Sequence, residues 1–224
     1  ECEVATPGAF RTVRVASHPL IVVRGQDGRL RAFYNICRHR GMQVMRQEAG
    51  QAKFFQCIYH LWTYGLDGCL SGVTLPEGYE GTGFCQKDFG LVAVRLETIG
   101  GLVFVCLNAN TEPLRDYLGA EMVGHIEDTV GRVELEVFHF HKQLIKANWK
   151  QFVDNNNEPY HNFLHVFNRN SSLSSSGENA CYPNGHYFSG SQYRVVNYGT
   201  FGLEGREKHL FPGTAANGLW TLII

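Results

Sequence analysis

Two short groups of cysteine and histidine constrain this chain more than any other feature of its sequence. Cys37 and His39 are separated by one residue, and after seventeen further residues Cys57 and His60 are separated by two. Two thiolates and two imidazoles can hold a [2Fe–2S] cluster, with both cysteines on one iron and both histidines on the other. Each pair must lie on a tight loop, and Gly41 permits the turn that the first loop needs.

A structural zinc site is the main alternative, because zinc is also bound by cysteine and histidine. Zinc fingers usually pair cysteine with cysteine and histidine with histidine, whereas each group here contributes one residue of each kind. The other alternative is a chance arrangement of two unrelated cysteines and two core histidines. We therefore predict an iron–sulfur cluster bound by Cys37, His39, Cys57 and His60.

These two groups make the chain resemble the Rieske proteins, in particular their oxygenase and ferredoxin branch. Respiratory Rieske proteins carry an extra cysteine in each loop and join the two in a disulfide. The matching positions here are Met42 and Tyr59, which cannot form one. The run His60-Leu61-Trp62 is similar to the His-Gly-Trp of the oxygenases, with a leucine in place of the glycine.

Composition limits the classes to which this chain can belong. It has 224 residues, of which 44% are hydrophobic, and a formal net charge of −1. This charge does not indicate nucleic acid or anionic membrane partners, and no apolar run approaches the length of a membrane span. The five cysteines outside the two groups are irregularly spaced, which predicts reduced thiols in a cytoplasmic protein. The chain starts without methionine and ends in an apolar run, so we expect a fragment of a longer protein.

Short strands separated by turn signals fill the first part of the chain. Hairpins are predicted at Asp27-Gly28, at Asp67-Gly68 and at Gly100-Gly101. About seven antiparallel strands would form a small β-sandwich or barrel with both cluster loops at one end. The predicted strands are 11–15, 20–24, 30–34, 53–56, 62–66, 69–71, 91–97 and 102–107.

The spacing of apolar residues changes from strand-like to helix-like after residue 112. Pro113 and the apolar spacing that follows it predict a connecting helix within 112–131. A long strand is predicted at 132–145, where His139 and His141 fit a polar strand face better than a metal pair. The Ser- and Asn-rich stretch 169–190 is predicted to be a loop, followed by strands at 193–198 and 219–224.

A second pair of histidines follows further along the chain. His161 and His165 are four residues apart, so on a helix they would lie on one face, one turn apart. With one carboxylate, such a pair forms the two-histidine, one-carboxylate site that leaves open positions on Fe(II). Taken alone, the pair is more typical of an amphipathic surface helix than of a metal site, because histidine pairs are common on protein surfaces.

The residues around this pair resemble the mononuclear-iron motif of Rieske oxygenase α subunits. The shared pattern is Asn148-Trp149-Lys150 followed by an acid, a Tyr-His pair and a further histidine, and it is closest to salicylate hydroxylases and to anthranilate and terephthalate dioxygenases. The family usually has four residues between its histidines and an aspartate as the acid, whereas this chain has three and Glu158. The resemblance implies that Glu158 bridges an iron histidine of one subunit to a cluster histidine of its neighbour.

The resemblance implies a two-part α+β chain. A Rieske-type antiparallel β domain would occupy 1–115, a connecting segment 116–131, and part of a helix-grip catalytic domain 132–224. The iron would be held by His161 and His165, and its third ligand, a carboxylate, would come from a region outside this chain.

The function implied is that of a terminal oxygenase acting on an aromatic substrate, in particular an aromatic acid. A ferredoxin and/or a reductase would pass electrons from NAD(P)H to the cluster, and Fe(II) would activate O₂. We expect a homotrimer or an α3β3 assembly. Two alternatives stay open: a Rieske monooxygenase or demethylase acting on a methylated acid or quaternary amine, and a pure electron carrier, which would need only the first domain.

Overall fold

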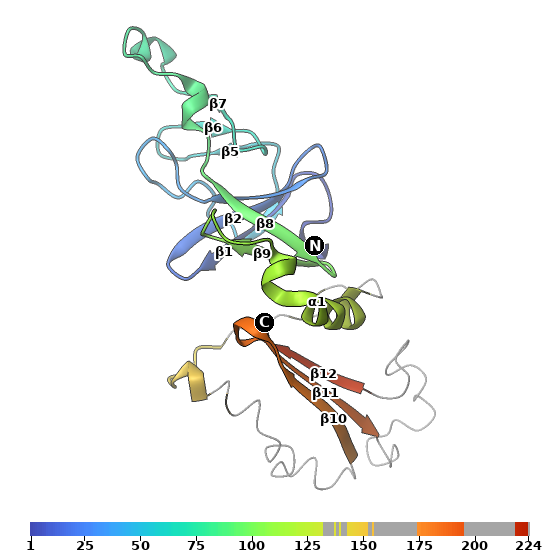
Figure 1. Ribbon diagram of the computed structural model, residues 1–224. Helices are drawn as coiled ribbons and strands as arrows, with labels where there is room; N and C mark the ends of the chain where they lie inside the picture. The colour runs from blue at the N-terminus through green and yellow to red at the C-terminus, as the bar shows by residue number, and fades with distance from the viewer. Residues whose placement is uncertain are drawn as a thin grey trace. The chain divides into compact units, whose positions relative to one another are not determined.

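The computed structural model describes residues 1–131, 137, 139, 143–151, 154, 174–194 and 218–223 of the chain (Figure 1). The chain divides into two compact units. One comprises Glu1–Glu112 and Val133–Phe138, and the other comprises Pro113–Arg132 and His139–Ile224. The described helices include none that is long and apolar enough to cross a membrane.

The larger sheet of the first unit has six strands in the order β4-β1-β2-β3-β8-β9. All of its neighbouring strands run antiparallel, as short hairpin connections require. The strands are β1 (Ala9–Val15), β2 (His18–Arg24), β3 (Leu30–Tyr34), β4 (Ala49–Gln51), β8 (Ala93–Ile99) and β9 (Leu102–Cys106).

A smaller antiparallel sheet carries the second cluster loop. Its strands are β5 (Phe55–Gln56), β6 (Thr63–Tyr64) and β7 (Leu70–Gly72), in that order across the sheet. The rings of Phe10 on β1 and Phe55 on β5 meet edge to face, with their centroids 6.0 Å apart. The core therefore joins the two sheets, and the predicted small antiparallel β domain is confirmed.

Strand β2 is buried on both faces, because alternate residues of a strand point to opposite sides of its sheet. Ile21 and Val23 belong to the same core cluster as Cys37 and Cys57. Leu20 and Val22 belong to a second cluster on the other face, with Val4 and Val94. The candidate cluster cysteines are thus part of the hydrophobic core.

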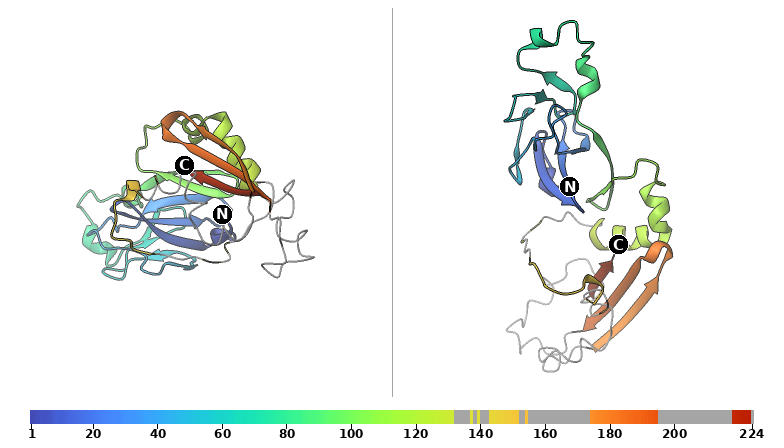
Figure 2. Two further views of the ribbon diagram at one scale, coloured as in Figure 1. Left: turned by 90° about the horizontal axis from the view of Figure 1, so that it is seen from below. Right: turned by 90° about the vertical axis from the view of Figure 1, so that its left-hand side faces the viewer.

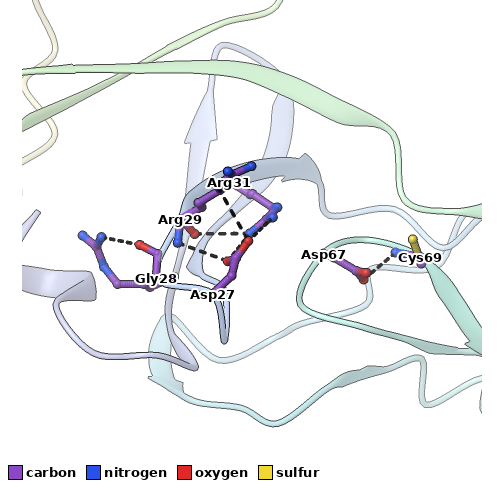
Figure 3. A network of polar contacts seen from close by, with 7 residues as sticks. Asp27, Gly28, Arg29, Arg31, Asp67 and Cys69 are labelled. Atoms are coloured by element: carbon purple, nitrogen blue, oxygen red, sulfur yellow. Dashed lines mark hydrogen bonds and ion pairs between the residues drawn. The ribbon is translucent and has the colours of Figure 1, made fainter.

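The hairpins predicted at two Asp-Gly pairs are confirmed, and both use the same local geometry (Figure 3). Gly28 and Gly68 have φ of +76° and +87°, which a residue without a Cβ adopts easily. A side-chain oxygen of Asp27 accepts the N–H of Arg29, and one of Asp67 accepts that of Cys69. The hairpin at Gly100-Gly101 is also present, between β8 and β9.

One strand of this unit was not predicted. Strand β4 consists of Ala49, Gly50 and Gln51, all exposed, and it pairs with the first residues of β1. These residues have no apolar alternation, so only their hydrogen bonding to β1 makes them a strand. The predicted strand 53–56 is reduced to the two residues of β5. Three short 3₁₀ turns complete the unit: Cys2–Val4, Pro76–Tyr79 and Gln86–Phe89.

The second unit begins with the helix that its apolar spacing predicts. Helix α1 spans Leu114–Ile126 directly after Pro113 and continues as a single wide turn over Glu127–Gly131. Its buried residues include Leu118, Met122 and Ile126, which lie four apart and therefore on one face. Gly119 interrupts the helical backbone with φ of +77°.

An antiparallel sheet of three strands follows, in the order β10-β11-β12. The strands are β10 (Ser174–Cys181), β11 (Tyr187–Arg194) and β12 (Gly218–Ile223), with a 3₁₀ turn at Pro183–Gly185. The prediction of a loop at 169–190 is wrong for 174–181 and 187–190. Ser-rich sequence has little strand preference of its own, but β10 pairs along its whole length with β11. The strand predicted at the end of the chain is confirmed by β12.

The long strand predicted at 132–145 is wrong where the chain is described. Val137, His139 and the residues from 143 to 146 have no strand structure. Leu144 is 92% exposed, and a tight turn joins the N–H of Ala147 to the carbonyl of Ile145. The alternating pattern predicts which face a strand would bury, but a strand also needs a hydrogen-bonded neighbour. His141 lies outside the described residues.

Candidate iron–sulfur site

The first cluster loop leaves strand β3 and folds back on itself within six residues of Cys37. The N–H of Cys37 donates to the carbonyl of Met42 at 2.8 Å, and the N–H of Gly41 donates to the carbonyl of Cys37 at 2.9 Å. Gly41 has φ of +74°, so the glycine turn predicted for this loop is confirmed. The loop holds its cysteine inside the core and its histidine near the tip.

The second loop repeats this backbone between strands β5 and β6. The N–H of Cys57 donates to the carbonyl of Trp62, and the N–H of Leu61 donates to the carbonyl of Cys57, both at 2.9 Å. Leu61 occupies the place of Gly41 and also has positive φ, +56°. A leucine in this conformation costs about 1–2 kcal/mol. The loop therefore keeps the same turn without the glycine that the family resemblance predicts at this position.

The two thiols lie together inside the core. Cys37 is 3% exposed and Cys57 is 1% exposed, and the two side chains are within hydrogen-bonding distance. Burial raises the pKa of the Cys57 thiol, and the thiol of Cys37 raises it further. The backbone N–H groups of Tyr59 and His60 act against this rise, because they donate to the sulfur of Cys57. A metal ion would supply the positive charge that a pair of buried thiolates needs.

The two histidine rings also lie together. The centroids of His39 and His60 are 4.6 Å apart, with the rings at 72° to each other. Nδ1 of His39 is buried without a hydrogen-bond partner. In the described part of the chain, every other buried side-chain nitrogen or oxygen has a partner. An unpartnered buried nitrogen is costly, and a bound metal would remove that cost.

Burial lowers the pKa of His39, and the neighbouring His60 and Arg40 lower it further. The neutral imidazole is the form that binds metal. The residues present therefore fit a cluster that takes two thiols on one iron and two imidazoles on the other.

Tyr64 is a residue of this site that the sequence analysis missed. Its hydroxyl lies 3.2 Å from the sulfur of Cys37 and accepts the N–H of Arg38 at 3.0 Å. Burial raises the pKa of Tyr64, and its hydrogen bond with Cys37 raises it further. A metal-bound thiolate has no proton, so the hydroxyl would donate to it. In the sequence, Tyr64 is visible only as a residue of a predicted strand.

Asn35 is a second missed residue, and it supports the first loop from inside. It is fully buried, and its side-chain oxygen accepts the N–H groups of Val44 and Met45 at 3.1 and 2.8 Å. Its side-chain nitrogen donates to the carbonyl of Met45 at 2.7 Å. The signal available in the sequence was a polar residue at the end of an apolar strand, directly before the loop.

The residues predicted to bind mononuclear iron, His161 and His165, lie outside the described residues, as does Glu158. At the start of that motif, a side-chain oxygen of Asn148 accepts the N–H of Lys150 at 3.0 Å. This contact is typical of the first residue of a helix. The iron site stays a prediction.

The family model for the Rieske [2Fe-2S] domain matches residues 1–80. The α subunit of 2-aminobenzenesulfonate 2,3-dioxygenase from Alcaligenes sp. is 36% identical over 99% of this chain and 61% of its own length. The hydroxylase α subunit of methanesulfonate monooxygenase from Methylosulfonomonas methylovora is 34% identical over 100% of this chain and 56% of its own length.

Two further matches connect the chain to aromatic-ring dioxygenases. The large subunit of anthranilate 1,2-dioxygenase from Burkholderia cepacia is 38% identical over 75% of this chain and 41% of its own length. The crystal structure of naphthalene 1,2-dioxygenase from Rhodococcus sp. matches with a TM-score of 0.78 and 29% identity, over 88% of this chain and 47% of that one. The chain thus spans between 41% and 61% of the length of these relatives. It belongs to the Rieske oxygenase family, and its relatives there are the α, or large, subunits.

Proposed function

We propose that this chain is part of the terminal oxygenase subunit of a system that hydroxylates an aromatic acid. The observation that carries the proposal is the arrangement of two buried thiols, Cys37 and Cys57, and two adjacent imidazoles, His39 and His60. That donor set suits a [2Fe–2S] cluster with mixed ligands. The unpartnered Nδ1 of His39 supports the same assignment.

When bound, the cluster would supply one-electron transfer from an outside donor toward the oxygenating iron. The protein would stabilise the negative charge that the sulfurs gain on reduction. Tyr64 can donate its hydroxyl to Cys37, and the backbone N–H groups of Tyr59 and His60 donate to Cys57. Hydrogen bonds to the sulfurs raise the reduction potential, because they favour the more negative state. The donor would be a ferredoxin and/or a reductase that draws on NAD(P)H.

In this proposal His161 and His165 would hold the mononuclear Fe(II), with a carboxylate as the third ligand. Two histidines and one carboxylate leave positions open for O₂ and substrate. Glu158 would bridge an iron histidine of one subunit to a cluster histidine of the next, since a carboxylate can accept from two imidazoles. This role requires a ring of subunits, either a homotrimer or an α3β3 assembly.

An aromatic acid is the substrate class that the relatives support. Two of the relatives reported above are named for benzene derivatives with an acidic group, one a sulfonate and one a carboxylate. An aromatic sulfonate and an aromatic carboxylate are therefore both candidate substrates.

The test is turnover by the full-length protein with a reductase and NADH. We expect O₂ consumption coupled to hydroxylated product with 2-aminobenzenesulfonate or anthranilate, and an iron content of about three per chain. Coupled turnover of glycine betaine, without turnover of either aromatic acid, would instead support the monooxygenase alternative. A protein that accepts and returns electrons but consumes no O₂ with any of these compounds would support a pure electron carrier.

A further inference from the structure

A segment rich in aromatic residues leaves the small sheet after β7 and returns before β8 (Figure 1, Figure 2). We refer to residues 73–90 as the aromatic excursion; it contains the 3₁₀ turns Pro76–Tyr79 and Gln86–Phe89. Three of its rings pack on one another. The centroids of Tyr79 and Phe84 are 4.5 Å apart, and those of Phe84 and Phe89 are 4.9 Å apart.

All three rings contact Trp62, which follows the second cluster loop. The centroid of the Trp62 ring lies 6.3 Å from that of Tyr79 and 5.9 Å from those of Phe84 and Phe89. Trp62 is only 3% exposed, so these contacts enclose it. Ring pairs at such separations each add about 0.5–1.5 kcal/mol beyond their buried area.

Trp62 in turn lies flat against His39. The two rings are within 9° of parallel, and their centroids are 4.8 Å apart. No hydrogen bond holds Nδ1 of His39, and rotation about the bond to an imidazole ring is only weakly restricted by the side chain itself. The orientation of this ring is therefore set by packing, with Trp62 on its face and His60 at its edge.

The aromatic excursion also holds the other histidine loop. The hydroxyl of Thr74 donates to the backbone carbonyl of His60 at 2.7 Å. The side chain of Gln86 donates to the carbonyl of Leu70 at 2.7 Å, which fixes the returning half of the excursion to β7. The excursion thus contacts both histidine loops. It reaches His39 through the rings stacked on Trp62, and it binds the backbone carbonyl of His60 through Thr74.

We propose that the aromatic excursion is a positioning element for the two histidine ligands. The positioning residues are Trp62, on which the excursion packs, and Thr74 of the excursion itself. The inference rests on the proposed function, because it assumes a cluster on His39 and His60. The ring stack sets the plane of His39 and keeps water from one of its faces. Access of water would favour the more negative, reduced state, so loosening the stack should raise the reduction potential.

The first test replaces one ring of the stack that runs from the excursion through Trp62 to His39, in the full-length, cluster-loaded protein. Phe84→Leu keeps an apolar side chain but removes a ring from the stack on Trp62, and Trp62→Phe keeps a smaller ring against His39. We expect both variants to retain iron and sulfide while the EPR g-values of the reduced cluster change and its midpoint potential rises. Phe10→Leu is the matched control, since it removes a ring from the same core at its contact with Phe55.

The second test addresses the other histidine. Thr74→Val removes the donor to the carbonyl of His60 and should also change the g-values. Thr12→Val is its control, because the Thr12 hydroxyl on β1 donates to the carbonyl of Gln47, which belongs neither to the excursion nor to a cluster loop. The same change in all five variants, the two controls included, would overturn the proposal, since it would report general loosening of the fold.

The outcomes separate this inference from the proposed function. If the parent protein binds no iron and sulfide, the proposed function fails and the inference fails with it. If the parent carries the cluster, but Phe84→Leu, Trp62→Phe and Thr74→Val lower only the melting temperature and leave the g-values and potential unchanged, the excursion is merely structural. In that case the inference is wrong while the proposed function stands.

Discussion

The hydroxyl of Tyr64 lies 3.2 Å from the sulfur of Cys37, although 26 residues separate the two in the sequence. The N–H of Arg38 donates to the same hydroxyl oxygen, which leaves the hydroxyl proton available to the sulfur. Strand β6 carries Tyr64 and the first loop carries Cys37, so the contact exists only when the small sheet is packed against the loop. This relationship makes the cluster's reduction potential sensitive to a residue that is not a ligand.

Tyr64→Phe should therefore lower the midpoint potential of the cluster. A hydrogen bond of this kind contributes about 1 kcal/mol, which for a one-electron couple corresponds to roughly 40 mV. The measurement is a redox titration followed by EPR or circular dichroism. Tyr34→Phe is the control, because Tyr34 packs against His18, away from the cluster loops. An unchanged potential would show that the tyrosine only fills space.

The ligand pattern was predictable from the sequence because it is local: each loop holds one cysteine and one histidine within four residues. The Asp-Gly hairpins were predictable for the same reason, since two residues determine the turn. Strand β10 was not predictable, because its serines become a strand only through pairing with β11. Tyr64 and Asn35 were missed because their roles depend on contacts made across the fold.

Leu61→Gly should stabilise the protein. Leu61 has φ of +56° and is 51% exposed, so its side chain gains little from burial while its backbone is strained. Removing the backbone strain should stabilise the folded state by about 1–2 kcal/mol. The greater freedom of glycine in the unfolded chain offsets part of this, so the free energy of unfolding should rise by about 1 kcal/mol or less. The rise is measured by thermal unfolding of parent and variant. Val92→Gly, at another exposed apolar residue without positive φ, should destabilise the protein.

Asn35→Ala should loosen the first cluster loop. The change leaves the buried N–H groups of Val44 and Met45 without their acceptor, at a cost of about 1–3 kcal/mol for each such group. We expect a lower unfolding temperature and faster loss of iron to a chelator. Asn35→Asp tests the cause, since it keeps an acceptor for both N–H groups, and only its neutral acid form keeps a donor to the carbonyl of Met45. Because the site is fully buried and an ionised carboxylate there is costly, the unfolding temperature of this variant should be higher at acid pH than at pH 7.

The ion pair at the first Asp-Gly turn should make stability depend on acid pH. Arg31 donates two hydrogen bonds to Asp27, at 2.8 and 2.7 Å, and holds the pKa of that carboxyl well below its usual range (Figure 3). A carboxyl with a depressed folded-state pKa stabilises the fold above its unfolded-state pKa of about 4, and the contribution is lost as pH falls toward the folded-state value.

Asp27→Asn isolates that contribution. The amide oxygen can still accept the N–H of Arg29, so the turn is kept while the charge is lost. We expect the difference in free energy of unfolding between parent and variant to be small at pH 7, to shrink further below pH of about 3, and to shrink in high salt, because Asp27 is exposed. A difference that is the same at every pH and salt concentration would mean that the turn, not the ion pair, was changed.

Glu158→Gln tests the proposed electron path between subunits. If Glu158 links a histidine of the iron site to a cluster histidine of the neighbouring subunit, the variant should keep its full iron content, because Glu158 ligates neither metal. It should nevertheless slow the reoxidation of a pre-reduced cluster in a single turnover with substrate and O₂. The amide oxygen can accept from one imidazole, but the amide offers an N–H where the second acceptor was. The simpler alternative is that Glu158 is an acid in the first turn of a helix, worth about 0.3–1 kcal/mol of stability. In that case the variant would lose a little stability while its cluster reoxidised at the parent rate, and the expectation of a ring of subunits would lose its main support.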